Sequence, residues 1–162
     1  METVDVVIET VKGSNSKYTY EPESGFFRLK KLLPVGMVFP YDFGFIPGTK
    51  GDDGDPLDAI VFSEFKNFPG CKIECRLIGS IQVMQTDNLN KKIKIRNDRF
   101  FVVPIQSIIY KTIASITELP GNLMNELEAF FIQYNKLEHK VFKITGRSGA
   151  PKSLKIISNS IG

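Results

Sequence analysis

Hydrophobic and polar residues alternate along much of the chain, which is the pattern of β-strands with one buried face. We expect strands at 4–11, 17–20, 26–33, 57–62, 71–83 and 141–145. Residues 91–95 and 99–103 are expected to form the two arms of a long hairpin. The segment 33–49 is so rich in proline, glycine and aromatic residues that we expect an irregular connection there.

A different spacing follows Pro120, where apolar residues recur every three or four positions. They are Leu123, Leu127, Phe130, Phe131, Tyr134 and Leu137. This stripe predicts a helix that starts after Pro120 and ends near Leu137. We assign no element to the tail from Gly146, which carries Gly, Ser and Pro. Short strands followed by one amphipathic helix predict a mainly β fold of the α+β class, a small closed barrel with the helix packed against it.

Composition changes this picture little. A chain of 162 residues with 42% hydrophobic and 24% charged residues suits a single globular domain, 1–162. Its net charge of +3 is too small to indicate a polyanionic partner. The first residues are acidic and no long apolar run follows, so we expect neither a signal peptide nor a membrane partner, and a cytoplasmic location.

The chemistry concentrates in one acidic loop. Four carboxylates fall within the seven residues from Asp52 to Asp58, directly before an apolar run. Two carboxylates about 5 Å apart repel by about 3 kcal/mol at an effective dielectric near 20, and a hard cation would remove that cost. Asp58 is placed on the strand, while Asp53 and Asp55 project from the loop before it, so the three can converge. The alternative is a solvated acidic turn, because Asp-Gly pairs are common in turns.

The run Asp53-Gly54-Asp55-Pro56-Leu57-Asp58-Ala59 resembles the signature of the soluble family I inorganic pyrophosphatases. Two further segments, 33–47 and 130–138, resemble the family's segment before that signature and its helix. The resemblance covers about residues 6–146 and implies a five-stranded OB-like barrel. It also implies hydrolysis of pyrophosphate with Mg²⁺ as cofactor and, since bacterial members are often hexamers and eukaryotic ones dimers, a homo-oligomer.

Individual roles follow from the same resemblance. Asp55 matches the catalytic carboxylate that orients the attacking water and takes its proton, and Glu9 matches an outer-shell acid. The metal ligands implied are Asp53, Asp58, Asp87 and Asp98, and the substrate-binding residues are Lys17, Lys31, Arg99 and Tyr134. Asp98 lies one residue off the family position, so it reaches the cluster only if a bulge or register change turns it inward.

Several positions depart from the family pattern. The family usually has arginine at Lys31, tyrosine at Phe39 and Phe43, glutamate at Thr19, lysine at Asn135 and aspartate at Asn97. If these changes only weaken the phosphate clamp, restoring lysine at 135 or tyrosine at 43 should improve turnover. The alternative is a divergent member that binds or slowly hydrolyses another phosphorylated ligand.

An OB-type module that binds single-stranded nucleic acid is a further alternative, because such barrels present aromatic platforms in a basic groove. The acidic loop argues against it, since without a metal it would repel phosphates. We therefore expect no nucleic-acid partner.

Overall fold

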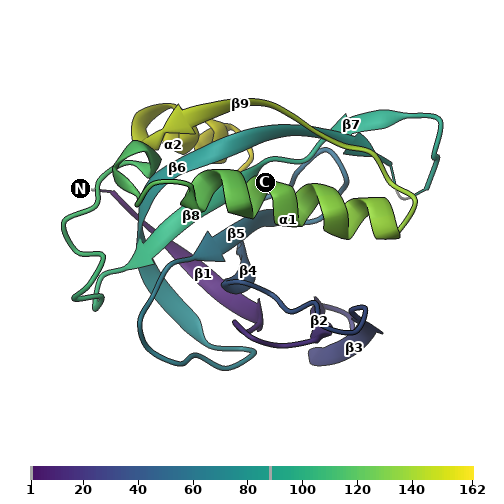
Figure 1. The fold of residues 1–162 in the computed structure, drawn as a ribbon, viewed down its shortest axis with the longest axis horizontal. Helices are drawn as coiled ribbons and strands as arrows, with labels where there is room; N and C mark the ends of the chain where they lie inside the picture. The colour runs from purple at the N-terminus through teal and green to yellow at the C-terminus, as the bar shows by residue number, and fades with distance from the viewer. Residues whose placement is uncertain (1, 88) are drawn as a thin grey trace.

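The computed structural model of the chain describes residues 2–87 and 89–162, so Met1 and Asn88 lie outside the description (Figure 1). In chain order the elements are β1 (Thr3–Thr10), β2 (Ser16–Glu21), β3 (Phe26–Leu32), β4 (Asp42–Ile46), β5 (Leu57–Val61), β6 (Lys72–Thr86), β7 (Lys94–Arg96), β8 (Arg99–Pro104), a 3₁₀ turn (Ile116–Glu118), α1 (Leu123–Leu137), β9 (Phe142–Gly149) and α2 (Ala150–Asn159). The expected helix is confirmed, and it ends at Leu137 as predicted.

Five of these strands close into a barrel in the order β1-β4-β5-β8-β6, and β6 returns to pair with β1. The pairing of β5 with β8 is parallel, and the other four pairings in the ring are antiparallel. Closure leaves the ring without an unpaired edge. β7 and β9 extend the sheet beside β6, and β2 with β3 forms a separate hairpin (Figure 1). The mainly β, closed-barrel class expected from the sequence is therefore confirmed.

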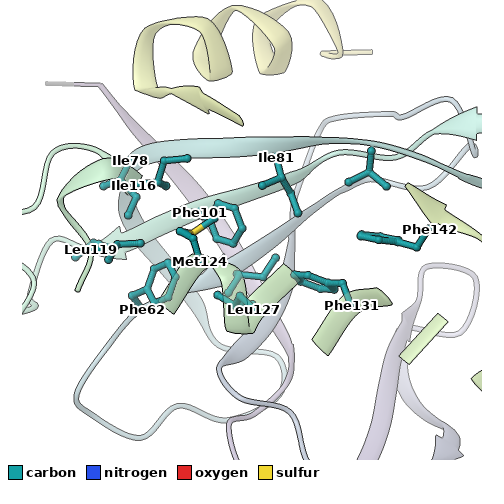
Figure 2. Packing of buried hydrophobic residues seen from close by; sticks show 13 residues of the cluster. Phe62, Ile78, Ile81, Phe101, Ile116, Leu119, Met124, Leu127, Phe131 and Phe142 are labelled. Carbon is teal, nitrogen blue, oxygen red and sulfur yellow. The ribbon is translucent and has the colours of Figure 1, made fainter. Parts of the chain in front are cut away.

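The barrel strands bury apolar side chains on both faces. On β5 and β8, Ala59 and Phe100 belong to one core cluster, and their neighbours Ile60 and Phe101 belong to the other. The second cluster is covered by α1, whose Leu127 and Phe131 pack among strand residues (Figure 2). Burying a Leu or Phe side chain contributes about 1.5–3 kcal/mol. These contacts hold α1 against the barrel and so fix the position of its last turn.

The prediction for residues 33–49 was wrong in part, because Asp42–Ile46 is a barrel strand, β4, that pairs with both β1 and β5. A Cβ at Gly44 would lie 2.1 Å from the Val7 carbonyl oxygen, so β1 crosses β4 at a distance that only glycine allows. The glycine that made the segment look irregular is what lets the strand form.

Residues 94–104 do not form a hairpin as predicted. β7 and β8 both pair with β6, and the register is the same on either side of Asn97 and Asp98, with Met84 opposite Arg96 and Ile81 opposite Arg99. β7 and β8 therefore follow one another along the same long partner strand, β6. The sequence shows two strand-forming segments but not the length of β6, which accepts both.

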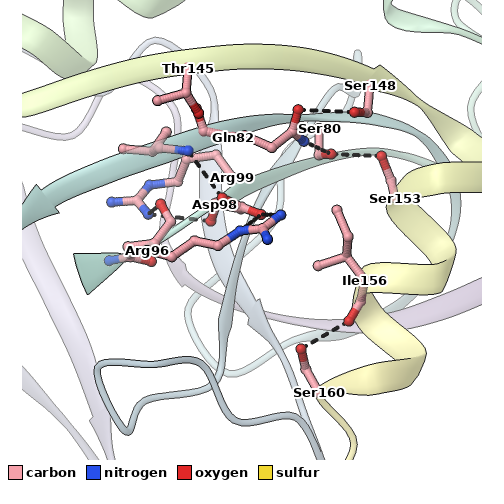
Figure 3. A network of polar contacts seen from close by, with 12 residues as sticks. Ser80, Gln82, Arg96, Asp98, Arg99, Thr145, Ser148, Ser153, Ile156 and Ser160 are labelled. Carbon is pink, nitrogen blue, oxygen red and sulfur yellow. Dashed lines mark hydrogen bonds and ion pairs between the residues drawn. The ribbon is translucent and has the colours of Figure 1, made fainter.

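The tail from Gly146 contains structure that the sequence analysis did not assign. β9 continues to Gly149, and α2 follows with proline in its first turn. Ile157 is buried, and the hydroxyl of Ser153 lies 2.7 Å from that of Ser80 on β6 (Figure 3). Pro151 followed by Leu154 and Ile157 at helical spacing is the signal that was available. In the described residues, neither helix has the length and apolar character needed to cross a membrane.

The close crossing of β1 and β4 gives a stability test. Gly44→Ala should lower the free energy of unfolding by at least about 2 kcal/mol, because the new methyl group meets backbone that cannot move aside. The measurement is urea unfolding followed by circular dichroism. Gly146→Ala is the matched control: its Cβ would lie 3.4 Å from Gln82 Oε1, an ordinary van der Waals distance, so a change within about 0.5 kcal/mol is expected. Equal stability of the two variants would contradict this account of β4.

Candidate active site

One cleft collects most of the residues that the sequence singled out. Seven of them line it, namely Glu9, Lys17, Asp53, Asp55, Asp58, Arg99 and Tyr134. They come from β1, β2, the acidic loop, β5, β8 and the last turns of α1. Lys30, Asn97, Asn135, Glu138 and Lys140 line the same cleft. The fold thus brings carboxylates and cationic side chains from six segments to one place.

The acidic loop forms one side of the cleft. Asp53 accepts hydrogen bonds from the Asp55 backbone N–H at 3.0 Å and from the Asn97 side-chain amide at 3.2 Å. Burial raises the pKa of Asp53 to about 6, and the charges of Asp58 and Asp55 add to that effect. Asp55 itself is exposed to solvent. Asp53 is therefore a carboxylate on which a neighbouring positive charge would be stabilising.

Asp58 and Arg99 stand opposite each other on the parallel strands β5 and β8. Their side chains form an ion pair, with 2.9 Å between Arg99 Nη1 and Asp58 Oδ2. Arg99 also donates to the Asn97 carbonyl oxygen at 2.7 Å, and its guanidinium lies 5.4 Å from the centre of the Phe142 ring. Several contacts therefore fix this cation beside the carboxylates.

Glu9 and Lys17 contribute one partly buried charge of each sign. Glu9 accepts hydrogen bonds from the Tyr20 N–H at 2.7 Å and from the Thr19 hydroxyl at 3.2 Å. Burial raises the pKa of Glu9 and lowers the pKa of Lys17, and for Lys17 the Asp58 carboxylate acts in the opposite direction. Removal from water thus disfavours the charged form of both side chains. A bound ligand of opposite charge would stabilise the charged form of each.

Tyr134 carries the one buried side-chain oxygen or nitrogen among the described residues that has no hydrogen-bond partner, its hydroxyl. The ammonium of Lys31 lies 4.1 Å above the Tyr134 ring and contacts Glu138. Leaving a buried hydroxyl unpaired costs about 1–3 kcal/mol. An acceptor oxygen bound in the cleft would remove that cost. Lys31 is thus close to the cleft although it is not part of its lining.

Asp87 and Asp98, the other two expected metal ligands, do not line this cleft, and Asp98 instead lines a neighbouring pocket with Asp53. Asp98 is buried, accepts from the Val83 N–H at 3.0 Å and pairs with Arg96 at 2.7 Å (Figure 3). The register with β6 is unchanged from Arg96 to Arg99, so the chain has at Asp98 neither the bulge nor the shift that would turn this side chain inward. Asp87 accepts from the Leu89 N–H at 3.3 Å in the turn before β7. The structure therefore brings Asp53, Asp55 and Asp58 together, and not these two.

The donor set of the acidic side fits a hard divalent cation, because it consists of carboxylate oxygens, the ligands that Mg²⁺ prefers. In the part of the chain that is described, no three His, Cys, Asp or Glu side chains already enclose a metal position. Asp58 is turned to Arg99 and Asp53 to Asn97. Carboxylates and cationic groups that line one cleft are compatible with a phosphorylated anion bound together with a cation.

Comparison with known proteins identifies the family. A family model described as inorganic pyrophosphatase matches residues 6–162. The inorganic pyrophosphatases of Synechocystis and of Sulfolobus acidocaldarius are each 34% identical, over 98% and 94% of this chain and 89% and 86% of their own length. The crystal structure of inorganic pyrophosphatase from Thermus thermophilus superposes with a TM-score of 0.89 at 31% identity, covering 99% of this chain and 90% of that one. The chain belongs to the inorganic pyrophosphatase family.

Proposed function

We propose that the protein hydrolyses inorganic pyrophosphate to two phosphates in a reaction that needs Mg²⁺. One observation carries the proposal: a single cleft is lined by the carboxylates Asp53, Asp55 and Asp58 together with Lys17, Arg99 and Tyr134, whose buried hydroxyl has no partner. Family membership supports the same activity.

The cationic side is suited to bind the substrate. Lys17 and Arg99 offer charged donors, and the Tyr134 hydroxyl would gain the acceptor that it lacks. Hydrogen bonds from charged groups to phosphate oxygens are worth about 1.5–3 kcal/mol each. Lys31, held beside the Tyr134 ring, adds positive charge at the rim. We assign these four residues to substrate binding.

The acidic side is suited to activate water. Asp53 and Asp58 would hold Mg²⁺, which when bound lowers the pKa of water and offsets the charge of the phosphoanhydride. Water then attacks one phosphorus atom, the bond from that phosphorus to the bridging oxygen breaks, and Asp55 takes the proton of the water. Glu9, as the outer-shell acid, would help to maintain the charge and position of these carboxylates. A homo-oligomeric state and a cytoplasmic location remain predictions.

Removing the proposed base should abolish turnover and leave the fold intact. We expect Asp55→Asn to lower kcat by roughly 10²- to 10⁴-fold, because proton acceptance is lost. The melting temperature should stay the same, since Asp55 is exposed. Phosphate release under saturating pyrophosphate and Mg²⁺ measures the effect. Asp52→Asn is the control, a neighbouring exposed carboxylate outside the cleft lining, and should keep wild-type turnover. Equal activity of the two variants would refute the role of Asp55.

Binding of the cation should be visible without turnover. Because Mg²⁺ would bind the folded state only, millimolar Mg²⁺ should raise the melting temperature of the wild type, and Asp58→Ala should remove that dependence. Asp52→Asn should retain it. Ca²⁺ should also stabilise the wild type but not support turnover, because its coordination is larger and more flexible. A wild-type melting curve that does not respond to Mg²⁺ would favour the solvated acidic turn.

A further inference from the structure

The turn after α1 brings a lysine back over the end of the helix. His139 has a positive φ of 59°, and it is the one non-glycine residue with positive φ among those described. Behind it, the Lys140 N–H donates to the Asn135 carbonyl oxygen at 2.9 Å. The left-handed conformation costs a non-glycine residue about 1–2 kcal/mol. The residue that follows this unfavourable backbone conformation, Lys140, lines the cleft.

Asn135 stands where the family usually has a lysine, and its neutral side chain brings no positive charge to this end of the cleft. Its side-chain nitrogen donates to the Phe131 carbonyl oxygen of the same helix at 2.8 Å, and the residue is 5% exposed. The amide is thus bound back onto α1. A positive charge at this end of the cleft must come from another residue.

Lys140 supplies such a charge. It lines the same cleft as Lys17, Arg99 and Tyr134, and its side chain is 23% exposed, which is low for a lysine. Its Nζ lies 3.8 Å from Glu138 Oε2, while Glu138 Oε1 contacts Lys31. One carboxylate is therefore shared by two ammonium groups.

The surroundings of Lys140 favour an anion. Burial lowers the pKa of Lys140, and the charges of Lys17, Lys30 and Lys91 act in the same direction. Several ammonium groups thus act on one another here, and Glu138 forms ion pairs with two of them, Lys31 and Lys140. An anion bound among these ammonium groups would offset their mutual repulsion, because opposite charges attract more strongly where water is partly excluded.

We propose that Lys140 is a substrate-binding residue, whose ammonium holds a phosphate group of the substrate at the end of the cleft beside Tyr134. In this role Lys140 supplies the positive charge that other family members have as a lysine at the position of Asn135. The inference rests on the proposed function for the identity of the substrate. It also changes the expectation for Asn135→Lys, which would add a second ammonium to a place already served.

The test compares kcat and KM for pyrophosphate in five variants and the wild type. Lys140→Gln should lower kcat/KM by about ten- to a hundred-fold, the value of one charged hydrogen bond. Lys140→Arg, which keeps the charge, should stay within about fivefold of the wild type. Lys136→Gln, an equal charge change at an exposed site outside the cleft, should stay within about twofold.

Rescue separates binding from a structural role. Asn135→Lys alone should change kcat/KM by less than about threefold, but in the Lys140→Gln background it should recover about tenfold. A Lys140→Gln variant within about twofold of the wild type would overturn the inference, as would a loss equal in Lys140→Arg. Lys140→Met, which keeps the stem without the charge, replaces Lys140→Gln if that variant does not fold.

A second readout keeps this inference distinct from the proposed function. The dissociation constant of methylenediphosphonate, which is not hydrolysed, is measured with Mg²⁺ in the same variants. If the wild type binds it but releases no phosphate from pyrophosphate, the proposed function fails, and the affinity ratio of wild type to Lys140→Gln still decides the role of Lys140. Absence of both binding and hydrolysis in the wild type would overturn both.

Discussion

The parallel pairing of β5 with β8 is the contact on which the site depends. It places Asp58 and Arg99 side by side on neighbouring strands, joined by an ion pair of 2.9 Å. Both strands belong to the closed ring and are buried on two faces, so the backbone positions from which these two side chains project are fixed by the core. The acidic loop enters directly before β5 and α1 packs over the same strands. Carboxylates and cationic groups are thus held close together by the barrel itself.

In this arrangement several charged side chains are held in unfavourable surroundings, and bound ligands of opposite charge would stabilise them. Burial raises the pKa of Asp53 and Glu9 and lowers the pKa of Lys17 and Lys140, so charges of both signs are held partly out of water. A cation on one side and a phosphorylated anion on the other would compensate both sets at once. An acceptor oxygen of such an anion would also give the buried Tyr134 hydroxyl the partner that it lacks.

Much of this could be predicted from the sequence, because alternation and helical spacing are local signals. They gave the closed barrel and α1, and the acidic run gave the side of the cleft formed by Asp53, Asp55 and Asp58. What failed depends on distant contacts. Gly44 permits β4 only because β1 crosses there, and residues 94–104 form no hairpin because the long strand β6 pairs with both β7 and β8. Lys140 reaches the cleft through the backbone turn at His139, where the sequence has no glycine to mark a left-handed turn after the helix.

The central claim is that this cleft uses a divalent cation to hydrolyse a phosphoanhydride. Its most direct test is phosphate release from pyrophosphate by the purified wild-type chain, first with millimolar Mg²⁺ and then with the metal removed by a chelator. The account predicts multiple turnovers with Mg²⁺ and a return to the uncatalysed rate without it, restored when Mg²⁺ is added back. Phosphate release that is absent with Mg²⁺, or that is unchanged by its removal, would contradict it.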